Sequence, residues 1–265
     1  MTYKLMALDL DGTLVSPDMQ ISPRVKHAIR CAMDKGIIVS LASGRAFDSM
    51  LPYVEDLGTA GPVIGYQGCE IVLPETREVI YRATIPLPEA RVLLEYAQSR
   101  DLDLTVYVDD HIYLREFRHP QEFYDKWFGL PCILVDDLVA GVCHRPTKVI
   151  ITGEGPENDR LMPELQGRFG SLFSIVRSHT LFIEGMPLGV SKGTALERVA
   201  ADLGIPQEQT LAIGDAGNDI EMISWAGLGV AMGNAQEDVK AVADFIAPSV
   251  EEDGAAVAIE AFCLG

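Results

Sequence analysis

Short apolar runs separated by helical patterns constrain the fold of this chain most strongly. The first three runs are residues 3–8, 37–42 and 62–66. Between them, Ser22 and Pro23 are typical of a helix N-terminus, Gly36 is typical of a helix end, and residues 46–57 form a second helical pattern. This alternation of strands and helices predicts an α/β fold with a parallel sheet.

The pattern changes in the middle of the chain, where predicted strands come in adjacent pairs. Residues 104–108 and 112–114 flank one turn, and residues 173–176 and 181–184 flank another. Adjacent strands with short turns indicate antiparallel hairpins. The alternating pattern returns from Ser191 onward. We therefore predict two domains, a core and an inserted α+β unit. The core is residues 1–83 and 189–265, and the insert is residues 84–188.

The first apolar run ends in the stretch LDLDGT, which places Asp9 and Asp11 at the predicted carboxyl edge of the sheet. Functional groups gather at this edge in parallel sheets. For Asp11 and Gly12 alone, an ordinary Asp-Gly turn is the favoured explanation. It does not explain Asp9, because an unpaired charge at a buried strand end is costly. Paired carboxylates are favourable there if they bind a cation such as Mg²⁺.

A second strand ends in the same way, in the stretch TLAIGDAGND. Asp215 follows the strand, and Asn218 and Asp219 stand at the start of a helix, where capping alone can explain them. Capping does not explain Asp215. If the two strands are neighbours, Asp9, Asp11, Asp215 and Asp219 converge into an oxygen-ligand site.

Two further stretches are candidates for binding phosphate. In GVSKGT, Ser191 can cap a helix that places Lys192 in its first turn, where a cation opposes the helix dipole. Lys192 can therefore bind a phosphate, or it can be a solvated surface lysine. In LASGRAF, Ser43 and Gly44 follow a strand and can bind phosphate oxygens at a helix start, or simply cap the helix. Arg45 adds a cation or faces solvent.

GVSKG also fits the pattern G-x-S-x-G of serine hydrolases, which require a histidine later in the chain. All five histidines precede Ser191, so we treat this match as accidental.

Composition excludes several classes of partner. The net charge is −18, which repels nucleic acid and anionic lipid, so we expect neither as a partner. The number of cysteines, five, is odd, and their spacing does not match that of zinc-binding cysteines. We therefore expect reduced thiols. No apolar run approaches the length of a membrane span, and the N-terminus does not resemble a signal peptide. We expect a cytoplasmic protein.

The motifs DLDGT, SGR, GVSKG and GDAGND, in this order, resemble the haloacid dehalogenase (HAD) superfamily. The hairpin-rich insert between SGR and the lysine is similar to that of the Cof-type phosphatases with a large α/β cap. This resemblance implies a Rossmann-like core and a cap that closes over the site and selects the substrate. The chain differs from the family in having Gln67-Gly68 where Asn-Gly is common, which changes a possible substrate contact.

The resemblance also implies roles for single residues. Asp9 is the expected nucleophile, forming an aspartyl-phosphate, and Asp11 the expected general acid and base. Mg²⁺ is the expected cofactor, bound by Asp9, the backbone carbonyl of Asp11, and Asp215, with Asp219 close by. The expected phosphate-binding residues are Ser43, Gly44, Lys192 and Asn218, and the possible substrate contacts are Arg45, Gln67 and Gly68.

The function that follows is a Mg²⁺-dependent phosphatase of small phosphorylated metabolites, either sugar phosphates or phosphorylated cofactors. Two alternatives stay open from sequence: a phosphomutase of the same superfamily, and a non-catalytic regulator that binds a phosphorylated metabolite. The expected assembly is a monomer or a weak homodimer.

Overall fold

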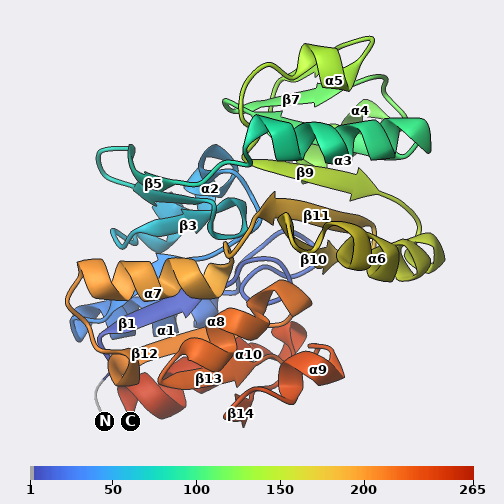
Figure 1. Cartoon of the computed structure of the whole chain (residues 1–265). Helices are drawn as coiled ribbons and strands as arrows, with labels where there is room; N and C mark the ends of the chain where they lie inside the picture. Colours follow the sequence, from blue (N-terminus) through green and yellow to red (C-terminus); the bar gives the residue numbers. More distant parts are fainter. Residues whose placement is uncertain (1–2) are drawn as a thin grey trace. The chain divides into compact units, whose positions relative to one another are not determined.

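The computed structural model describes residues 3–265 of the chain, and its contacts divide the chain into two compact units (Figure 1). The first unit is Met1–Tyr81 together with Ser191–Gly265, and the second is Arg82–Val190.

A five-stranded parallel sheet forms the centre of the first unit, as the sequence predicts. Its strand order is β14-β13-β12-β1-β2, so the first strand of the chain lies beside β12, which comes about 200 residues later. The register pairs Leu8 with Ile213 at the carboxyl ends. The strands are β1 (Leu5–Leu8), β2 (Ile38–Leu41), β12 (Thr210–Gly214), β13 (Leu228–Ala231) and β14 (Phe245–Ile246).

Helices cover both faces of this sheet (Figure 1). They are α1 (Pro23–Asp34), α2 (Phe47–Leu57), α7 (Lys192–Asp202), α8 (Ile220–Trp225), α9 (Glu237–Lys240) and α10 (Gly254–Ile259), with the short helices η1 (Tyr66–Gly68), η2 (Gln207–Gln209), η3 (Gly217–Asp219), η4 (Val250–Glu252) and η5 (Glu260–Leu264). Ser22 caps α1 as expected, accepting a hydrogen bond from the N–H of Val25. Gly36 follows α1 with a φ of 85°, which glycine adopts readily.

The alternating side chains of β1 explain why both sheet faces are covered. Met6 and Leu8 pack into one apolar cluster with residues of α1, α2 and α10. Leu5 and Ala7 point the other way, into a cluster with residues of α7 and α8. All four side chains are fully buried. A central strand that is buried on both faces has apolar residues at successive positions, and this explains the continuous apolar run in the sequence of β1.

The third apolar run differs from the sequence prediction. β3 (Val63–Gly65) is not a full member of the parallel sheet, because only a single parallel bridge joins Ala42 to Ile64. It pairs antiparallel with β4 (Glu70–Leu73), and β5 (Glu78–Arg82) completes a separate three-stranded sheet. The sequence prediction missed β4 and β5.

The second unit is an α+β unit built on a six-stranded sheet of order β10-β11-β9-β6-β7-β8. Its strands are β6 (Asp103–Val108), β7 (His111–Leu114), β8 (Cys132–Leu134), β9 (Lys148–Thr152), β10 (Phe173–His179) and β11 (Phe182–Pro187). The predicted hairpins β6–β7 and β10–β11 are both present. Asp109 and Asp110 turn the first hairpin with positive φ angles, which tight hairpin turns require.

Four helices complete the second unit: α3 (Leu87–Ser99), α4 (Gln121–Trp127), α5 (Leu138–Gly141) and α6 (Gly155–Phe169). Side chains of α3, α5 and α6 share one apolar cluster with β6, β9, β10 and β11. The unit therefore has a hydrophobic core of its own. Over residues 3–265, no helix combines the length and apolar character that crossing a membrane requires. The five cysteines are free.

Candidate active site

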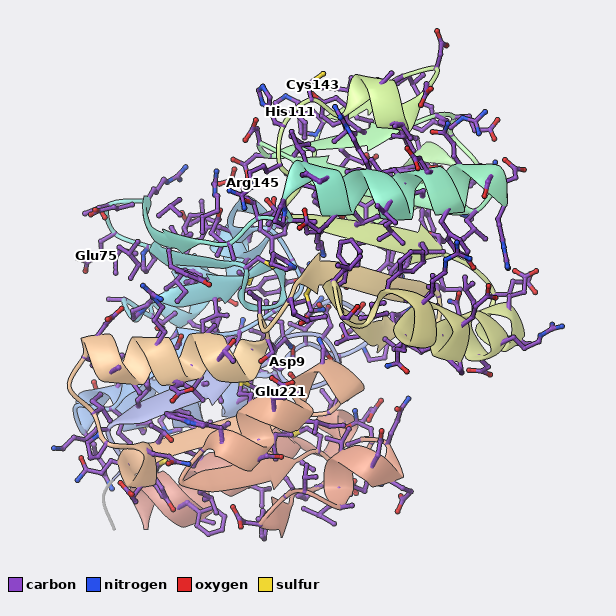
Figure 2. All side chains as sticks on the ribbon, viewed as in Figure 1. Asp9, Glu75, His111, Cys143, Arg145 and Glu221 are labelled. Atoms are coloured by element: carbon purple, nitrogen blue, oxygen red, sulfur yellow. The ribbon has the colours of Figure 1, made fainter. Side chains whose placement is uncertain are left out.

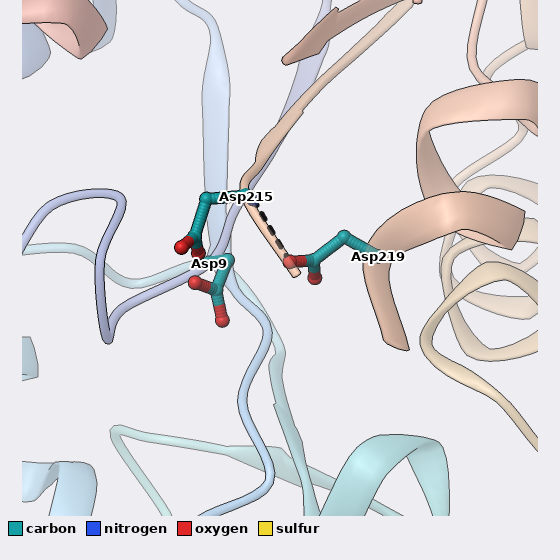
Figure 3. Close-up of side chains that lie close together, drawn as sticks. All are labelled: Asp9, Asp215 and Asp219. Carbon is teal, nitrogen blue, oxygen red and sulfur yellow. Dashed lines mark hydrogen bonds between the residues drawn. The ribbon is translucent and has the colours of Figure 1, made fainter. Parts of the chain in front are cut away.

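Three carboxylates from distant parts of the chain meet at the carboxyl edge of the parallel sheet (Figure 3). Asp9 directly follows β1, Asp215 directly follows β12, and Asp219 ends the short helix η3. Each offers an oxygen within 4.8 Å of an oxygen of the other two. β1 and β12 are hydrogen-bonded neighbours with Leu8 opposite Ile213, so Asp9 and Asp215, which follow them, lie close together at this edge.

A buried lysine compensates part of this negative charge. Lys192 is 1% exposed, and its Nζ lies 2.6 Å from Asp9 Oδ1 and 2.7 Å from Asp219 Oδ1. Ser191 caps α7 and places Lys192 in the first turn. Ser191 Oγ also donates to Glu221, and Figure 2 shows Asp9 and Glu221 near this end of α7. Lys192 is therefore not a solvated surface lysine.

The electrostatics of the cluster follow from burial and charge crowding. Burial, followed by the charge of Asp219, raises the pKa of Asp9 well above its usual value, although Lys192 opposes this shift. The same two causes raise the pKa of Asp215 to about 7. Burial alone would lower the pKa of Lys192, but the charges of Asp219 and Asp9 outweigh it and raise that pKa. The acids thus carry more negative charge than one ammonium neutralises.

Asp219 uses both carboxylate oxygens within the protein. One accepts from Lys192, and the other accepts from the N–H groups of Asp215 and Ala216 at 3.1 Å each. Gly214 makes this close approach possible, since a Cβ there would lie 2.5 Å from the Asp219 side chain. Asp219 therefore holds the loop after β12 and Lys192 in place.

Asp215 is held by two residues, Thr13 and Asn234, that sequence reasoning did not assign to the site. Thr13 Oγ1 donates to its Oδ1 at 3.2 Å, and Asn234 Nδ2 lies 3.3 Å from its Oδ2. The same Asn234 amide donates to the Gly12 carbonyl at 2.9 Å. Gly12 has a φ of 86°, and a Cβ there would lie 2.4 Å from Asp215. Asn234 follows β13 closely, so the rule that found Asp9 and Asp215 at strand ends could have found it.

Asp11 does not join the carboxylate cluster. Its side chain is 44% exposed and accepts two hydrogen bonds from Arg45, from Nε at 2.8 Å and from Nη2 at 2.6 Å. From sequence, we expect Arg45 to add a cation to the site or to face solvent. In the structure it forms a bidentate ion pair with Asp11. Such paired geometry fixes the direction of a carboxylate more firmly than a single contact does.

Ser43 and Gly44 lie in the loop after β2. The helix α2 begins only at Phe47, with Ala46 at its N-cap, so the prediction that Ser43 caps a helix opened by Gly44 is wrong. Ser43 is buried, and its Oγ accepts from the N–H of Arg45 at 3.2 Å. A hydroxyl that accepts in this way still has its proton to donate.

Gln67, which is buried, and Asn218, which is half-buried, form an amide pair beside this loop. Asn218 Nδ2 donates to Gln67 Oε1 at 2.7 Å, and Gln67 is 1% exposed. A Cβ on Gly44 would lie 2.5 Å from Gln67 Nε2, so the glycine leaves room for the glutamine. Gly68 has a φ of 100° and leaves room for the carbonyl of Ser191. This packing accommodates the full length of the Gln67 side chain.

The Lys192 pairing yields a prediction about stability. With divalent cations chelated, Lys192→Met leaves Asp9 and Asp219 buried without their cation and costs about 3–5 kcal/mol at pH 8. The pKa of Asp9 is raised in the folded state, so protonation of Asp9 stabilises the folded protein at low pH. This stabilisation is lost as the pH rises. The cost is therefore smaller at pH 5. Urea unfolding at both pH values measures it.

Lys240→Met is the control, since Lys240 pairs with Glu237, a side chain that is 92% exposed. That variant should change stability little at either pH. An equal cost for the two variants would contradict the charge-compensating role of Lys192.

Comparison with known proteins agrees with this geometry. The family model described as haloacid dehalogenase-like hydrolase matches residues 6–259. A 5-amino-6-(5-phospho-D-ribitylamino)uracil phosphatase of Bacillus subtilis is 32% identical over 262 residues, covering 98% of this chain and 96% of that protein.

Solved structures give the same result. A haloacid dehalogenase-like hydrolase from Bacteroides thetaiotaomicron is 33% identical, with a TM-score of 0.84 and coverage of 98% of this chain and 99% of that one. A sugar phosphatase of HAD subclass IIB is 26% identical, with a TM-score of 0.82 and coverage of 98% of both chains. With a family match over nearly its whole length, the chain belongs to the haloacid dehalogenase-like hydrolases and is a phosphatase of the HAD type.

Proposed function

We propose that this protein is a Mg²⁺-dependent phosphatase that hydrolyses small phosphorylated metabolites through a phosphorylated Asp9. The observation that supports this most strongly is the buried contact of Asp9 with Lys192, beside Asp215 and Asp219. A nucleophilic carboxylate splits phosphate ester hydrolysis into two easier steps. In the first step Asp9 attacks phosphorus and the alcohol leaves; in the second step water attacks the phosphorus of the aspartyl-phosphate and frees Asp9.

Asp11 is the proposed acid and base for these two steps. It would donate a proton to the leaving oxygen and then take one from the attacking water. Its partly exposed position allows exchange of protons with solvent. Because Arg45 holds both oxygens of Asp11, we propose that Asp11 changes partner, from Arg45 to the leaving oxygen, when substrate binds.

The phosphoryl oxygens need donors that meet them as charge develops. Lys192 supplies an ammonium directly beside the attacking carboxylate. Ser43 supplies a hydroxyl whose oxygen is already fixed by the N–H of Arg45. We propose that these two groups and the backbone at Gly44 bind the transferring phosphoryl group. Asn218 contributes by holding Gln67 at the edge of the same loop.

The residues present fit a divalent cation of the Mg²⁺ type. Three carboxylates are gathered within 4.8 Å, and oxygen is the donor that such hard cations prefer. Their crowding and burial raise the pKa values of Asp9 and Asp215, a cost that a bound cation relieves. Asp9 and Asp215 would hold the ion, with the backbone carbonyl of Asp11 as in the family. When bound, Mg²⁺ offsets the repulsion between a carboxylate and a phosphate.

The substrate class follows from the relatives and from the phosphate donors. One relative is named for a phosphorylated ribitylaminouracil and one structural neighbour is named a sugar phosphatase. We therefore propose phosphomonoesters of sugars or of cofactor-like metabolites as substrates. The second unit, Arg82–Val190, is the proposed source of substrate choice.

The first experiment tests the nucleophile. Purified protein with Mg²⁺ is assayed for phosphate release from a panel of sugar phosphates and phosphorylated cofactors. Asp9→Asn should reduce the rate at least about 1,000-fold, because an amide does not replace a nucleophilic carboxylate. Asp18→Asn is the matched control, an exposed acid nearby in the chain that should change the rate little.

Three outcomes separate the alternatives. Isomerised sugar phosphate with little free phosphate would indicate a phosphomutase, and binding without turnover would indicate a regulator. A phosphate-releasing Asp9→Asn protein would falsify the assigned nucleophile.

Rapid quenching followed by borohydride, which reduces an aspartyl-phosphate to homoserine, should convert residue 9 in turnover samples and leave residue 18 unchanged.

The second experiment tests the metal site with a readout that does not depend on turnover. Mg²⁺ added to chelator-treated protein should raise its unfolding temperature, since a ligand that binds only the folded state stabilises it. Asp215→Asn should require at least about tenfold more Mg²⁺ for the same rise, a loss of about 1.4 kcal/mol in binding. Asp18→Asn should behave as the unchanged protein, and equal titrations for both variants would contradict the assignment.

A further inference from the structure

The strand β5 is an exposed sheet edge with an unusual sequence. It is the last strand of the three-stranded sheet β3-β4-β5, so one side of its backbone has no neighbouring strand in that sheet. Four of its five residues are exposed, including Val79 at 41% and Ile80 at 37%. These two apolar side chains are adjacent in the strand and so lie on opposite faces. Exposed apolar edges of this kind tend to pair with another strand.

The two faces of β5 carry different side chains. Tyr81 lies under the guanidinium of Arg198 at 4.3 Å and packs against the apolar cluster of α7 and α8, so Val79 shares that face. Glu78, Ile80 and Arg82 share the opposite face. Figure 2 shows Glu75 in the turn that precedes the strand and projects from the hairpin. The strand therefore presents an acid, an aliphatic residue and a base in a row on one face.

This row is self-complementary when the strand is reversed. We propose that β5 pairs antiparallel with β5 of a second copy of this chain, around a two-fold axis at Ile80. In that register Glu78 faces the partner's Arg82, Val79 faces the partner's Tyr81, and Ile80 faces the partner's Ile80. Opposite charges and apolar–aromatic pairs are the favourable cross-strand combinations. A two-fold interface uses the same surface on both copies, which this sequence allows.

The charge pattern favours a second copy over an unrelated partner. Each copy carries a net charge of −18, so two copies repel unless their contact has local attraction. The two Glu78–Arg82 pairs supply that attraction. Arg82 Nη2 also lies 3.7 Å from Asp110 in an exposed ion pair, which is weak, and the five N–H donors of a guanidinium can serve two carboxylates. One strand from each copy predicts a weak, concentration-dependent dimer.

Sedimentation velocity at about 0.15 M salt, from about 5 to about 500 µM protein, tests the proposal. The unchanged chain should shift from the 28.9 kDa monomer toward twice that mass. Glu78→Arg should stay monomeric over this range, because it places Arg opposite the partner's Arg82. Glu237→Arg, which changes net charge equally on an exposed side chain of α9, should dimerise at least as well as the unchanged chain.

The register itself is tested by a double reversal. Arg82→Glu alone should stay monomeric, whereas Glu78→Arg with Arg82→Glu restores opposite charges across the axis and should restore the dimer. Circular dichroism of each variant confirms that it is folded. A monomer at every concentration for the unchanged chain, or a double variant that stays monomeric while folded, overturns the proposal.

Discussion

The site depends on the contacts that the buried ammonium of Lys192 makes with two carboxylates. This ammonium contacts Asp9 and Asp219 and is almost fully shielded from solvent. Two carboxylates so close together repel each other strongly in a low-dielectric interior, and an ammonium between them converts most of that repulsion into attraction. Burial is the main cause of the raised pKa values of Asp9 and Asp215, and the negative charge that one cation leaves among three acids adds to it. That residual charge is the physical basis for proposing a bound divalent ion.

The parallel sheet itself brings these acids together. β1 and β12 are parallel neighbours whose carboxyl ends differ by one residue in register, so Asp9 and Asp215 lie close together once β1 lies beside β12. Glycines at positions 12 and 214 remove the side chains that would otherwise block the close approach of the acids. The Asn234 side chain then links the loops after three strands, because its Nδ2 contacts the Gly12 carbonyl and Asp215 and its Oδ1 accepts from the N–H of Val250. The fold thus places the acids by backbone position, and Lys192 reaches them from α7.

Sequence reasoning found the features that depend on local pattern. Apolar runs that end in acids identified the strands β1 and β12, and Ser191 before Lys192 identified the start of α7. It was wrong about β3, because an apolar run after a helix looks the same whether the strand joins a parallel sheet or a hairpin. It also missed the Asp11–Arg45 pair and the Asn218–Gln67 pair. These contacts join loops far apart in the sequence, and no local periodicity encodes them.

The most direct test of this account is a crystal structure of the protein soaked with Mn²⁺, with the metal located by its anomalous scattering. The account requires one strong peak within bonding distance of carboxylate oxygens of both Asp9 and Asp215, while Lys192 keeps its contact with Asp9. A peak that binds elsewhere, or no peak at a Mn²⁺ concentration that stabilises the folded protein, would contradict it. The position of that single ion decides whether acids at opposite ends of the chain form one catalytic centre.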